Sequence, residues 1–276
     1  MKALVIGLGE VGYPIYKMLV KTYGDGDIIG YDPAKEGHDV SVKEPCEFLH
    51  ICFPQTVNFI EQVGEYVKEH DPAIVIVHST LSPGISEKLS YWLRPDAFCE
   101  KPGLFYSPVR GNIRDGMTWG LETYTKYLAP VLRGRRSRLS LTKLDEHYIE
   151  TAKTHLEESG MTVQLCDWPS LEYAKLFNLA YYGTCIAIFQ EFERIIEDEN
   201  LDYEVIKSFI ESTETEAQAG DKRVPRTLYY GGYIGGHCII PGMEKILAKH
   251  PGAGLFRAVM DSNIKREREL LLKTTS

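Results

Sequence analysis

Short apolar runs alternate with longer segments of helical periodicity along the first half of the chain. The short runs are rich in β-branched residues and predict strands at 2–6, 27–32, 48–53 and 73–78. Apolar residues recur every three to four positions in the segments between or after them, which predicts helices at 13–23, 57–69 and 85–94. Strands that alternate with helices indicate a parallel sheet covered by helices on both faces.

The second half of the chain has a different pattern. A weaker strand at 97–106, a helix at 147–159 and a strand at 161–165 complete the first part. Helical patterns then dominate, at 169–200 with Gly183 as a candidate kink, at 202–217 and at 254–273. We therefore predict two domains, 1–167 with the sheet and 168–276 mostly helical. A loop rich in glycine and aromatic residues, 229–238, lies between the later helices.

A glycine motif follows the first predicted strand and opens the first predicted helix. It reads Gly7-Leu8-Gly9-Glu10-Val11-Gly12, and Asp32 ends the next strand 20 residues after the last glycine. This context is typical of a dinucleotide-binding turn, in which the glycines let the backbone approach a pyrophosphate at a helix N-terminus. A carboxylate at position 32 favours ribose hydroxyls and repels a 2′-phosphate, so NAD is the predicted cofactor. The fold class expected is a Rossmann-type doubly wound α/β sheet.

Composition and charge limit the kinds of partner, metal site and cellular location that the sequence predicts. The 276 residues carry a formal net charge of −8, which disfavours nucleic acid as a partner. The basic run Arg133–Arg138 is interpreted as a solvated loop. The six cysteines show no metal-ligand spacing and are expected to be reduced thiols. This spacing predicts no metal site. No leader segment and no membrane-spanning run is recognised, so the sequence predicts a cytoplasmic protein.

Four further segments carry candidate chemistry. They are His78-Ser79-Thr80-Leu81-Ser82-Pro83-Gly84, Tyr106-Ser107-Pro108-Val109-Arg110-Gly111, Leu171-Glu172-Tyr173-Ala174-Lys175-Leu176-Phe177-Asn178 and Gly235-Gly236-His237-Cys238-Ile239-Ile240-Pro241. In this order after the glycine motif, the set resembles the UDP-glucose/GDP-mannose dehydrogenase family over residues 1–270. The chain is similar to a short form that ends before the family's third, nucleotide-sugar-binding domain.

The resemblance implies an activity and a set of roles. The family oxidises a sugar-nucleotide alcohol to a carboxylate with two NAD, through an aldehyde bound to a cysteine as a thiohemiacetal and then a thioester. Cys238 matches that nucleophile, Lys175 the lysine that stabilises oxyanions, and Thr80 the threonine that positions water and cofactor. The remaining predicted site residues are Asn178 as a catalytic residue, Arg226, Arg110 and His237 near the substrate, and Glu10, Val11 and Pro54 near the cofactor.

Three positions depart from the family pattern. Val109 stands where a glutamate follows Ser-Pro, and Leu179 stands where an asparagine lies four residues after the lysine, with Asn178 one residue earlier. Gly242 stands where an aspartate lies four residues after the cysteine. These departures affect the groups that the family uses for general acid/base catalysis and for thioester hydrolysis.

The residues by themselves support the nucleophile less strongly than the resemblance does. A thiol flanked by glycines is accessible, yet free cysteines are often simply buried, and a lysine in an apolar helix often only reaches toward solvent. His237 is expected to shape its loop rather than to bind a metal, because no partner ligands have suitable spacing.

Two other functions are compatible with the sequence. One is a single hydride transfer on a β-hydroxyacid, as in the related phosphogluconate and hydroxyisobutyrate dehydrogenases, with Lys175 as general base. The other is an NAD-binding protein without turnover, which the departures at Val109 and Gly242 suggest. In each case the ligand is a small molecule. The helical half is expected to form a homodimer, because it lacks the apolar self-sufficiency of a monomeric bundle and because the resemblance implies that its long helix is the dimer element.

Overall fold

The chain folds into two compact units, Met1–Lys175 and Leu176–Ser276. The structure is a computed structural model that describes residues 1–34, 44–94, 101–111, 116–132, 141–220 and 227–275. The division between the units falls inside one long helix, α6 (Trp168–Asp198). The helix whose start is the predicted domain boundary therefore contributes to both units.

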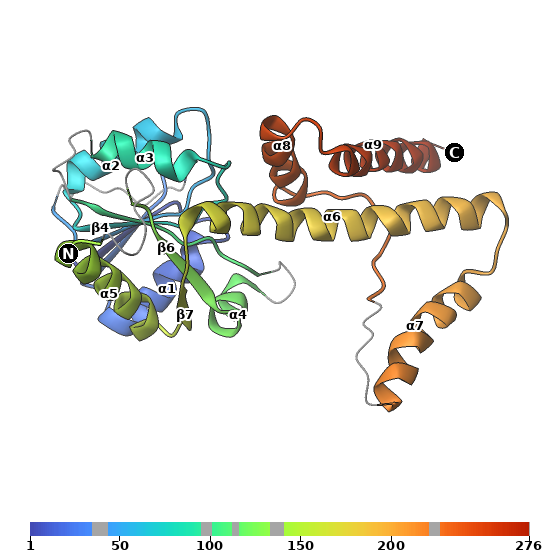
Figure 1. The fold of residues 1–276 in the computed structure, drawn as a ribbon, viewed down its shortest axis with the longest axis horizontal. Coiled ribbons are helices and arrows are strands. Elements are labelled where there is room, and N and C mark those ends of the chain that lie inside the picture. Colours follow the sequence, from blue (N-terminus) through green and yellow to red (C-terminus); the bar gives the residue numbers. More distant parts are fainter. Residues whose placement is uncertain (35–43, 95–100, 112–115, 133–140, 221–226, 276) are drawn as a thin grey trace. The chain divides into compact units, whose positions relative to one another are not determined.

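Unit 1 is built on a sheet with the strand order β2-β1-β3-β4-β5-β6-β7 (Figure 1). The strands are β1 (Ala3–Ile6), β2 (Ile28–Tyr31), β3 (Phe48–Ile51), β4 (Ile74–Val77), β5 (Gly103–Tyr106), β6 (Lys126–Pro130) and β7 (Val163–Leu165). The first five pair in parallel. The chain leaves β1 toward β2 and returns to β3 on the other side of β1, so the carboxyl ends of β1 and β3 flank the topological switch point, where ligands of open α/β sheets bind.

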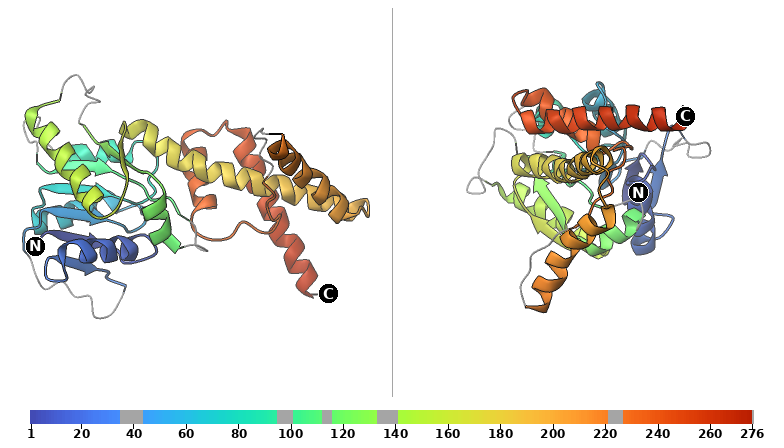
Figure 2. Two further views of the ribbon diagram at one scale, coloured as in Figure 1. Left: turned by 90° about the horizontal axis from the view of Figure 1, so that it is seen from below. Right: turned by 90° about the vertical axis from the view of Figure 1, so that its right-hand side faces the viewer.

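Helices cover both faces of this sheet, as the pattern of apolar residues predicts. On one face, α1 (Gly12–Tyr23) and α5 (Lys143–Glu158) pack against alternate residues of the strands such as Val5 and Ile76. On the other face, α2 (Phe59–His70) and α3 (Ile85–Leu93) pack against the intervening residues, such as Leu4 and Val75. The same two layers can be followed in Figure 2. The predicted doubly wound α/β fold is confirmed.

Three elements of the structure were not expected from the sequence. One is α4 (Gly116–Thr123), whose two glycines weaken the helical signal. The next strand, β6, begins at a buried lysine and ends at a proline, and it pairs antiparallel with β5, so the sheet is mixed rather than purely parallel. The third is α8 (Ile239–Lys249), in which Pro241 occupies the first turn, where the backbone nitrogen has no partner within the helix.

Unit 2 consists of the remainder of α6 with α7 (Tyr203–Ala219), α8 and α9 (Gly254–Thr275). A small apolar core joins α6, α8 and α9 to the glycine-rich loop through Leu176, Ile234, Met243 and Val259, whereas α7 contributes no buried residue. Asp202 caps α7 by accepting hydrogen bonds from the amides of two residues of its first turn. The predicted helices at 202–217 and 254–273 match α7 and α9.

Candidate active site

The three glycines of the motif after β1 differ in how closely the surrounding atoms approach them. Gly7 has a φ of +88°, and a Cβ atom there would lie 2.8 Å from the backbone nitrogen of Phe53. A Cβ atom on Gly12 would overlap the carbonyl oxygen of Gly7, so this position needs glycine for close packing of helix and turn. A Cβ atom on Gly9 would meet no atom of the described residues within 4 Å. The fold itself therefore requires Gly7 and Gly12, whereas Gly9 leaves open space above the turn.

Asp32 follows β2 and braces this turn. One carboxylate oxygen accepts a hydrogen bond from the backbone amide of Leu8 at 2.9 Å, and the other accepts one from that of Ala34 at 3.0 Å. A carboxylate has about four acceptor positions, so both oxygens retain capacity for a ligand hydroxyl. Glu10 is exposed, and Val11, the residue before α1, makes no side-chain cap, so the helix begins without one.

The loops after β3 and β4 lie at the same edge of the sheet and are hydrogen bonded to each other. The hydroxyl of Ser79 donates to the carbonyl oxygen of Phe53, and the side-chain oxygen of Gln55 accepts from the amide of Ser82 at 2.6 Å. These bonds position the two predicted cofactor residues of the loops, the exposed Pro54 and the half-buried Thr80.

Glu172 fixes the loop after β4 from the start of α6. Its buried carboxylate accepts hydrogen bonds from the amides of Gly84 at 2.6 Å and Ser86 at 2.9 Å, and so caps the N-terminus of α3. The sequence segment containing Glu172 was singled out, but this role was not predicted. The available signal was an acidic residue within an otherwise apolar turn of a helix.

Lys175 lies one turn after Glu172 and reaches the loop that follows β5. Its ammonium group donates to the carbonyl oxygen of Val109 at 2.8 Å. Val109 is itself buried in the core, so the position where the family has a carboxylate is apolar here. Arg110, the predicted substrate residue, donates to the carbonyl oxygen of Thr125 at 2.6 Å, and its guanidinium lies over the ring of Tyr127, 5.2 Å from the centroid.

Two of the predicted site residues in unit 2 lie next to each other before α8. Cys238 is exposed and directly precedes the first residue of that helix, and His237 is exposed beside it. Gly236 has a φ of +79°, which turns the loop into the helix. Asn178 is half-buried and follows Lys175 by three residues in α6. Arg226 and the basic run Arg133–Arg138 lie outside the described residues.

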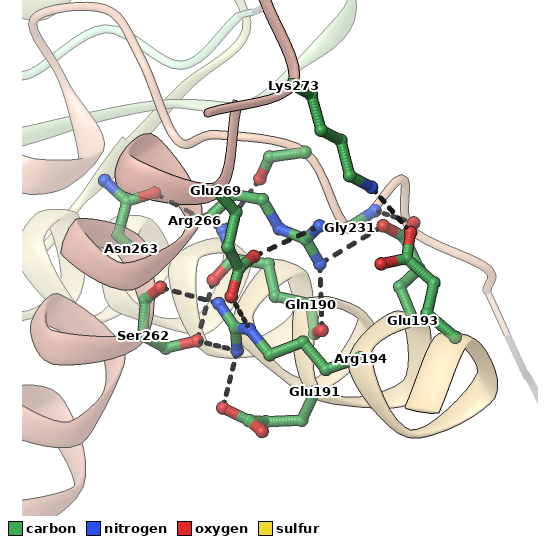
Figure 3. Close-up of polar contacts among 12 residues, drawn as sticks. Gln190, Glu191, Glu193, Arg194, Gly231, Ser262, Asn263, Arg266, Glu269 and Lys273 are labelled. Carbon is green, nitrogen blue, oxygen red and sulfur yellow. Dashed lines mark hydrogen bonds and ion pairs between the residues drawn. The ribbon is translucent and has the colours of Figure 1, made fainter. Parts of the chain in front are cut away.

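A buried polar network holds the glycine-rich loop against α6 and α9 (Figure 3). The side chain of Asn263 accepts from the amide of Ile234 at 2.7 Å and donates to the carbonyl oxygen of the same residue at 3.2 Å. Gln190 donates to the carbonyl oxygen of Gly232 at 2.7 Å, and the carboxylate of Glu193 accepts from the amide of Gly231 at 3.1 Å. The loop that leads to Cys238 is therefore fixed by several hydrogen bonds.

Two arginines complete that network. Arg194 is buried and forms ion pairs with Glu191 at 2.6 Å and Glu269 at 2.7 Å, and it also donates to the carbonyl oxygen of Ser262 at 2.9 Å. Arg266 is paired with Glu193 at 3.2 Å. Because the charges are matched within unit 2, the network joins α6 to α9 without leaving an isolated charge. The sequence reasoning missed it, since bonded residues of the network lie up to 76 positions apart in the chain.

Comparison with solved structures identifies the fold. The chain matches the UDP-D-ManNAc dehydrogenase of Pyrococcus horikoshii with a TM-score of 0.71 and 18% identity, over 96% of this chain and 69% of that one. The UDP-N-acetyl-mannosamine dehydrogenase of Staphylococcus aureus matches with a TM-score of 0.72 and 17% identity, over 100% of this chain and 70% of that one. The chain has the fold of these dehydrogenases. At this level of identity the match confirms the resemblance as one of fold.

A smaller dehydrogenase shares the same fold. The 3-hydroxyisobutyrate dehydrogenase of Mycobacterium tuberculosis matches with a TM-score of 0.63 and 16% identity, over 96% of this chain and 92% of that one. No protein-family model matches the sequence, and a comparison with curated proteins finds no match. The likeness to these dehydrogenases is therefore one of structure.

The described residues contain no second kind of site among those with a recognisable geometry. Within them, no group of histidine, cysteine, aspartate and glutamate side chains could hold a metal ion. The five cysteines in the described part of the chain form no disulfide. None of the described helices combines the length and the apolar character that crossing a membrane requires.

Proposed function

We propose that the chain is an NAD-dependent oxidoreductase that oxidises an alcohol on a sugar or a sugar nucleotide. The observation that carries this proposal is the open space at Gly9, at the switch point of the sheet, beside a turn whose other two glycines the fold itself requires. A position that glycine occupies without any steric need of the protein is suited to a ligand that approaches the backbone.

The residues at this edge of the sheet fit the cofactor. Gly7, Gly9, Glu10, Val11 and Gly12 would surround the pyrophosphate at the N-terminus of α1. The carboxylate of Asp32 would accept hydrogen bonds from the adenosine ribose, and its charge disfavours the 2′-phosphate of NADP. Pro54 and Thr80 would line the nicotinamide end. When bound, the nicotinamide accepts the hydride that the alcohol carbon loses.

The catalytic roles are proposed residue by residue, from the positions that match the family pattern. Lys175, held by the Val109 carbonyl, would stabilise negative charge on the substrate oxygen. Asn178, one turn later in α6, would assist it. Thr80 would orient a water molecule. Cys238, which lies directly before the first residue of α8, would add to the aldehyde. Arg110, Arg226 and His237 would contact the substrate.

A product assay tests this proposal. The full chain is incubated with NAD and a panel of sugar nucleotides, sugars and β-hydroxyacids, and NADH is counted per molecule of substrate consumed. Two NADH per substrate, with Cys238→Ser accumulating an aldehyde, is the expected result. Turnover that Cys238→Ser leaves unchanged would remove the nucleophile. NAD binding without any turnover would indicate a non-catalytic relative.

A second candidate is single hydride transfer on a β-hydroxyacid, with Lys175 as general base. It is favoured by the 3-hydroxyisobutyrate dehydrogenase match, which covers nearly the whole of both chains. It is also favoured by the apolar side chain at Val109 and the absence of any side chain at Gly242, where the four-electron chemistry uses carboxylates. Loss of turnover in Lys175→Ala, one NADH per substrate and full activity in Cys238→Ser would select this function.

We also propose that unit 2 mediates homodimerisation and that residues 1–167 and 168–276 act as the cofactor domain and the substrate and dimerisation domain. An apolar stripe runs along α6 at spacings of three, four and seven residues. Its members are exposed, between 39% and 62%: Phe177, Tyr181, Ile188, Phe192 and Ile195. Light scattering at micromolar concentration should give twice the chain mass, and Ile188→Glu should give the single mass. A wild-type monomer would contradict the proposal.

A further inference from the structure

A line of buried histidines crosses the core of unit 1 between the sheet and α5. The Nδ1 atom of His50 lies 2.9 Å from Nε2 of His78, and its Nε2 atom lies 3.0 Å from Nε2 of His155. The exposed fractions of the three side chains are 0%, 2% and 2%. The function proposed above uses none of them, and a buried polar network of this size in an otherwise apolar core requires an explanation.

The inner end of this line lies at the carboxyl edge of the sheet. The Nζ atom of Lys126, at the start of β6, is 3.2 Å from Nδ1 of His78 and also donates to the carbonyl oxygen of Ser107. Ser107 directly follows β5, and the carbonyl two residues later, that of Val109, accepts from Lys175. The two lysines therefore donate to the same short segment, at the edge where the substrate is proposed to bind.

The outer end of the line reaches solvent. The Nδ1 atom of His155, in α5, lies 3.0 Å from the hydroxyl oxygen of Tyr23, which is at the end of α1. That hydroxyl donates to the exposed carboxylate of Glu158 at 2.9 Å. Because α1 runs antiparallel to the strands, its last residue lies at the opposite edge of the sheet from the glycine turn. The hydrogen bonds are thus continuous from one edge of the sheet to the other.

The arrangement is not that of a metal site. Each nitrogen of His50 faces a different ring, so the three rings cannot direct their lone pairs at one ion. The described residues contain no group of side chains that could hold a metal. The rings are instead connected in series. Each of them has one nitrogen toward the inner neighbour and the other nitrogen toward the outer neighbour, which is the geometry that a tautomer shift requires.

We propose that Lys126, His78, His50, His155, Tyr23 and Glu158 form a proton-transfer chain that carries protons from the carboxyl edge of the sheet to solvent. The proposal rests on the dehydrogenase function, because each oxidation of an alcohol releases one proton from the substrate hydroxyl. The amine of Lys126 takes up that proton, and a carboxylic acid at Glu158 finally releases it to water. No electron moves along the chain.

Each link breaks one N–H or O–H bond and forms another. Lys126 gives a proton to Nδ1 of His78, whose Nε2 proton passes to Nδ1 of His50. The Nε2 proton of His50 passes to Nε2 of His155. The Nδ1 proton of His155 then passes to the hydroxyl oxygen of Tyr23, as the phenolic proton of Tyr23 moves to Glu158. One relay moves one proton outward and leaves each of the three rings in its other tautomer. In the shifted state, the Ser107 carbonyl accepts the Nδ1 proton of His78 at 3.0 Å.

The electrostatic environment suits this role. The pKa of Lys126 is lowered to about 7, chiefly by burial and also by the nearby charges of Lys175 and Arg110, whereas Cys52 opposes the shift. Both the charged and the neutral form of Lys126 are therefore populated near neutral pH. Burial also lowers the pKa of His50 to about 3, and that of His155 to about 2 with Lys2 adding to the effect. The rings are therefore neutral, with one proton each.

The first test does not need turnover. Nitrogen NMR of the full chain with labelled histidine, at pH 7, reports which ring nitrogen carries the proton. Proton transfer in series allows only two combinations of protonated nitrogens. In the first, His78 and His50 carry the proton on Nε2 and His155 carries it on Nδ1. In the second, His78 and His50 carry it on Nδ1 and His155 carries it on Nε2. Either set, or an average of the two, is expected. A mixed set, or a charged ring among the three, would overturn the proposal.

The second test uses a side chain that can donate and accept but cannot change tautomer. In His50→Gln, proton release, followed with a pH indicator dye during a single turnover, should be about 10-fold slower or more, with the Kd for NAD unchanged. His70→Gln is the matched control, because His70 is similarly buried and its ring contacts the carbonyl oxygen of Glu44 at 3.3 Å rather than another histidine of the described residues. Equal proton-release rates in His50→Gln and wild type would overturn the proposal.

A surface pair of variants covers the case in which His50→Gln does not fold. Glu158→Gln should slow proton release, whereas Glu157→Gln, which affects only an exposed ion pair with Lys153 at 3.7 Å, should not. Equal rates in this pair would count against the chain. If the wild type neither binds NAD nor reduces it, the dehydrogenase function fails, and the NMR result still decides whether the protons are arranged for transfer.

Discussion

Leu179 and Gly242 fill one space in unit 2: the Cδ1 atom of Leu179 lies 2.8 Å from the position that a Cβ atom on residue 242 would take. These are two of the positions at which the chain departs from the pattern of the sugar-nucleotide dehydrogenases, where an asparagine and an aspartate are expected. The two departures are therefore linked. A larger apolar side chain on α6 occupies the volume that the missing side chain on α8 would need.

This pairing predicts non-additive mutational effects. Gly242→Asp alone should lower the free energy of unfolding by about 2–3 kcal/mol, because it overpacks the site and buries a carboxylate against a leucine. Adding Leu179→Asn should recover about half of that loss. Urea denaturation of both variants measures the coupling, and Gly252→Asp, at an open position, is the control. Strict additivity would contradict the steric link.

The glycine motif predicts a separation of folding from binding. Gly9→Ala should keep the wild-type melting temperature and lose NAD affinity by about 10-fold or more, because the new methyl group enters only the space assigned to the pyrophosphate. Gly12→Ala should instead lower the melting temperature, because its Cβ overlaps the Gly7 carbonyl. Gly26→Ala, another open position, should change neither property. Differential scanning fluorimetry with and without NAD distinguishes these results, and unchanged NAD affinity in Gly9→Ala would refute the assignment of that space.

The fold of unit 1 could be predicted because its signals are local. The turn around Gly7 and the acid at Asp32 are recognisable from spacing alone, and the buried strands are continuous apolar runs. The strand β6 was missed because its first residue, Lys126, is a charged side chain buried by partners that are distant in sequence. His50, His78 and His155 likewise looked like isolated residues, since only the sheet and α5 bring them into line.

The polar anchors of unit 2 were beyond prediction for the same reason. Asn263 and Gln190 have ordinary sequence neighbours, and their partners in the glycine-rich loop are set by how α6 and α9 pack. By contrast, Cys238 and Lys175 were singled out through motifs, which identify residue types and order without giving contacts. The carbonyl of Val109 as the partner of Lys175 follows only from the structure.

Asn263 is predicted to set the rigidity of the loop before Cys238. Asn263→Ala leaves the buried amide and carbonyl of Ile234 without their partner, which should cost about 2–3 kcal/mol of unfolding free energy. It should also raise the hydrogen-exchange rates of amides in 231–236. Gln218→Ala, on the exposed end of α7, serves as the control. Unchanged exchange in the loop would show that the network does not hold it.

The buried histidines predict a loss of stability in mild acid. The folded state keeps all three rings neutral, because burial lowers their pKa values far below 6.5, whereas the unfolded chain protonates them near that value. The unfolded state thus binds more protons below pH 6.5, and stability falls as the pH falls. At pH 5.5 three such groups cost about 4 kcal/mol relative to pH 7.5.

Urea midpoints at pH 7.5, 6.5 and 5.5 measure this effect. The window lies above the range in which most carboxylates titrate, so the slope reports mainly on histidines. His155→Phe should reduce the slope by about a third, because one of the three buried rings no longer titrates. A stability that does not change over this range would mean that the rings are already charged, or are solvated, in the folded state.

Each function proposed for the chain requires the dinucleotide site. Isothermal titration of NAD into the full chain should give saturable binding of one NAD per chain, weaker for NADP. Asp32→Ala should reduce the NAD affinity by about 10-fold, through loss of a charged hydrogen-bond acceptor and of the bond that braces Leu8. Asp25→Ala, on the exposed turn before β2, should bind as the wild type does. Absence of saturable NAD binding to the wild-type chain would contradict the central claim.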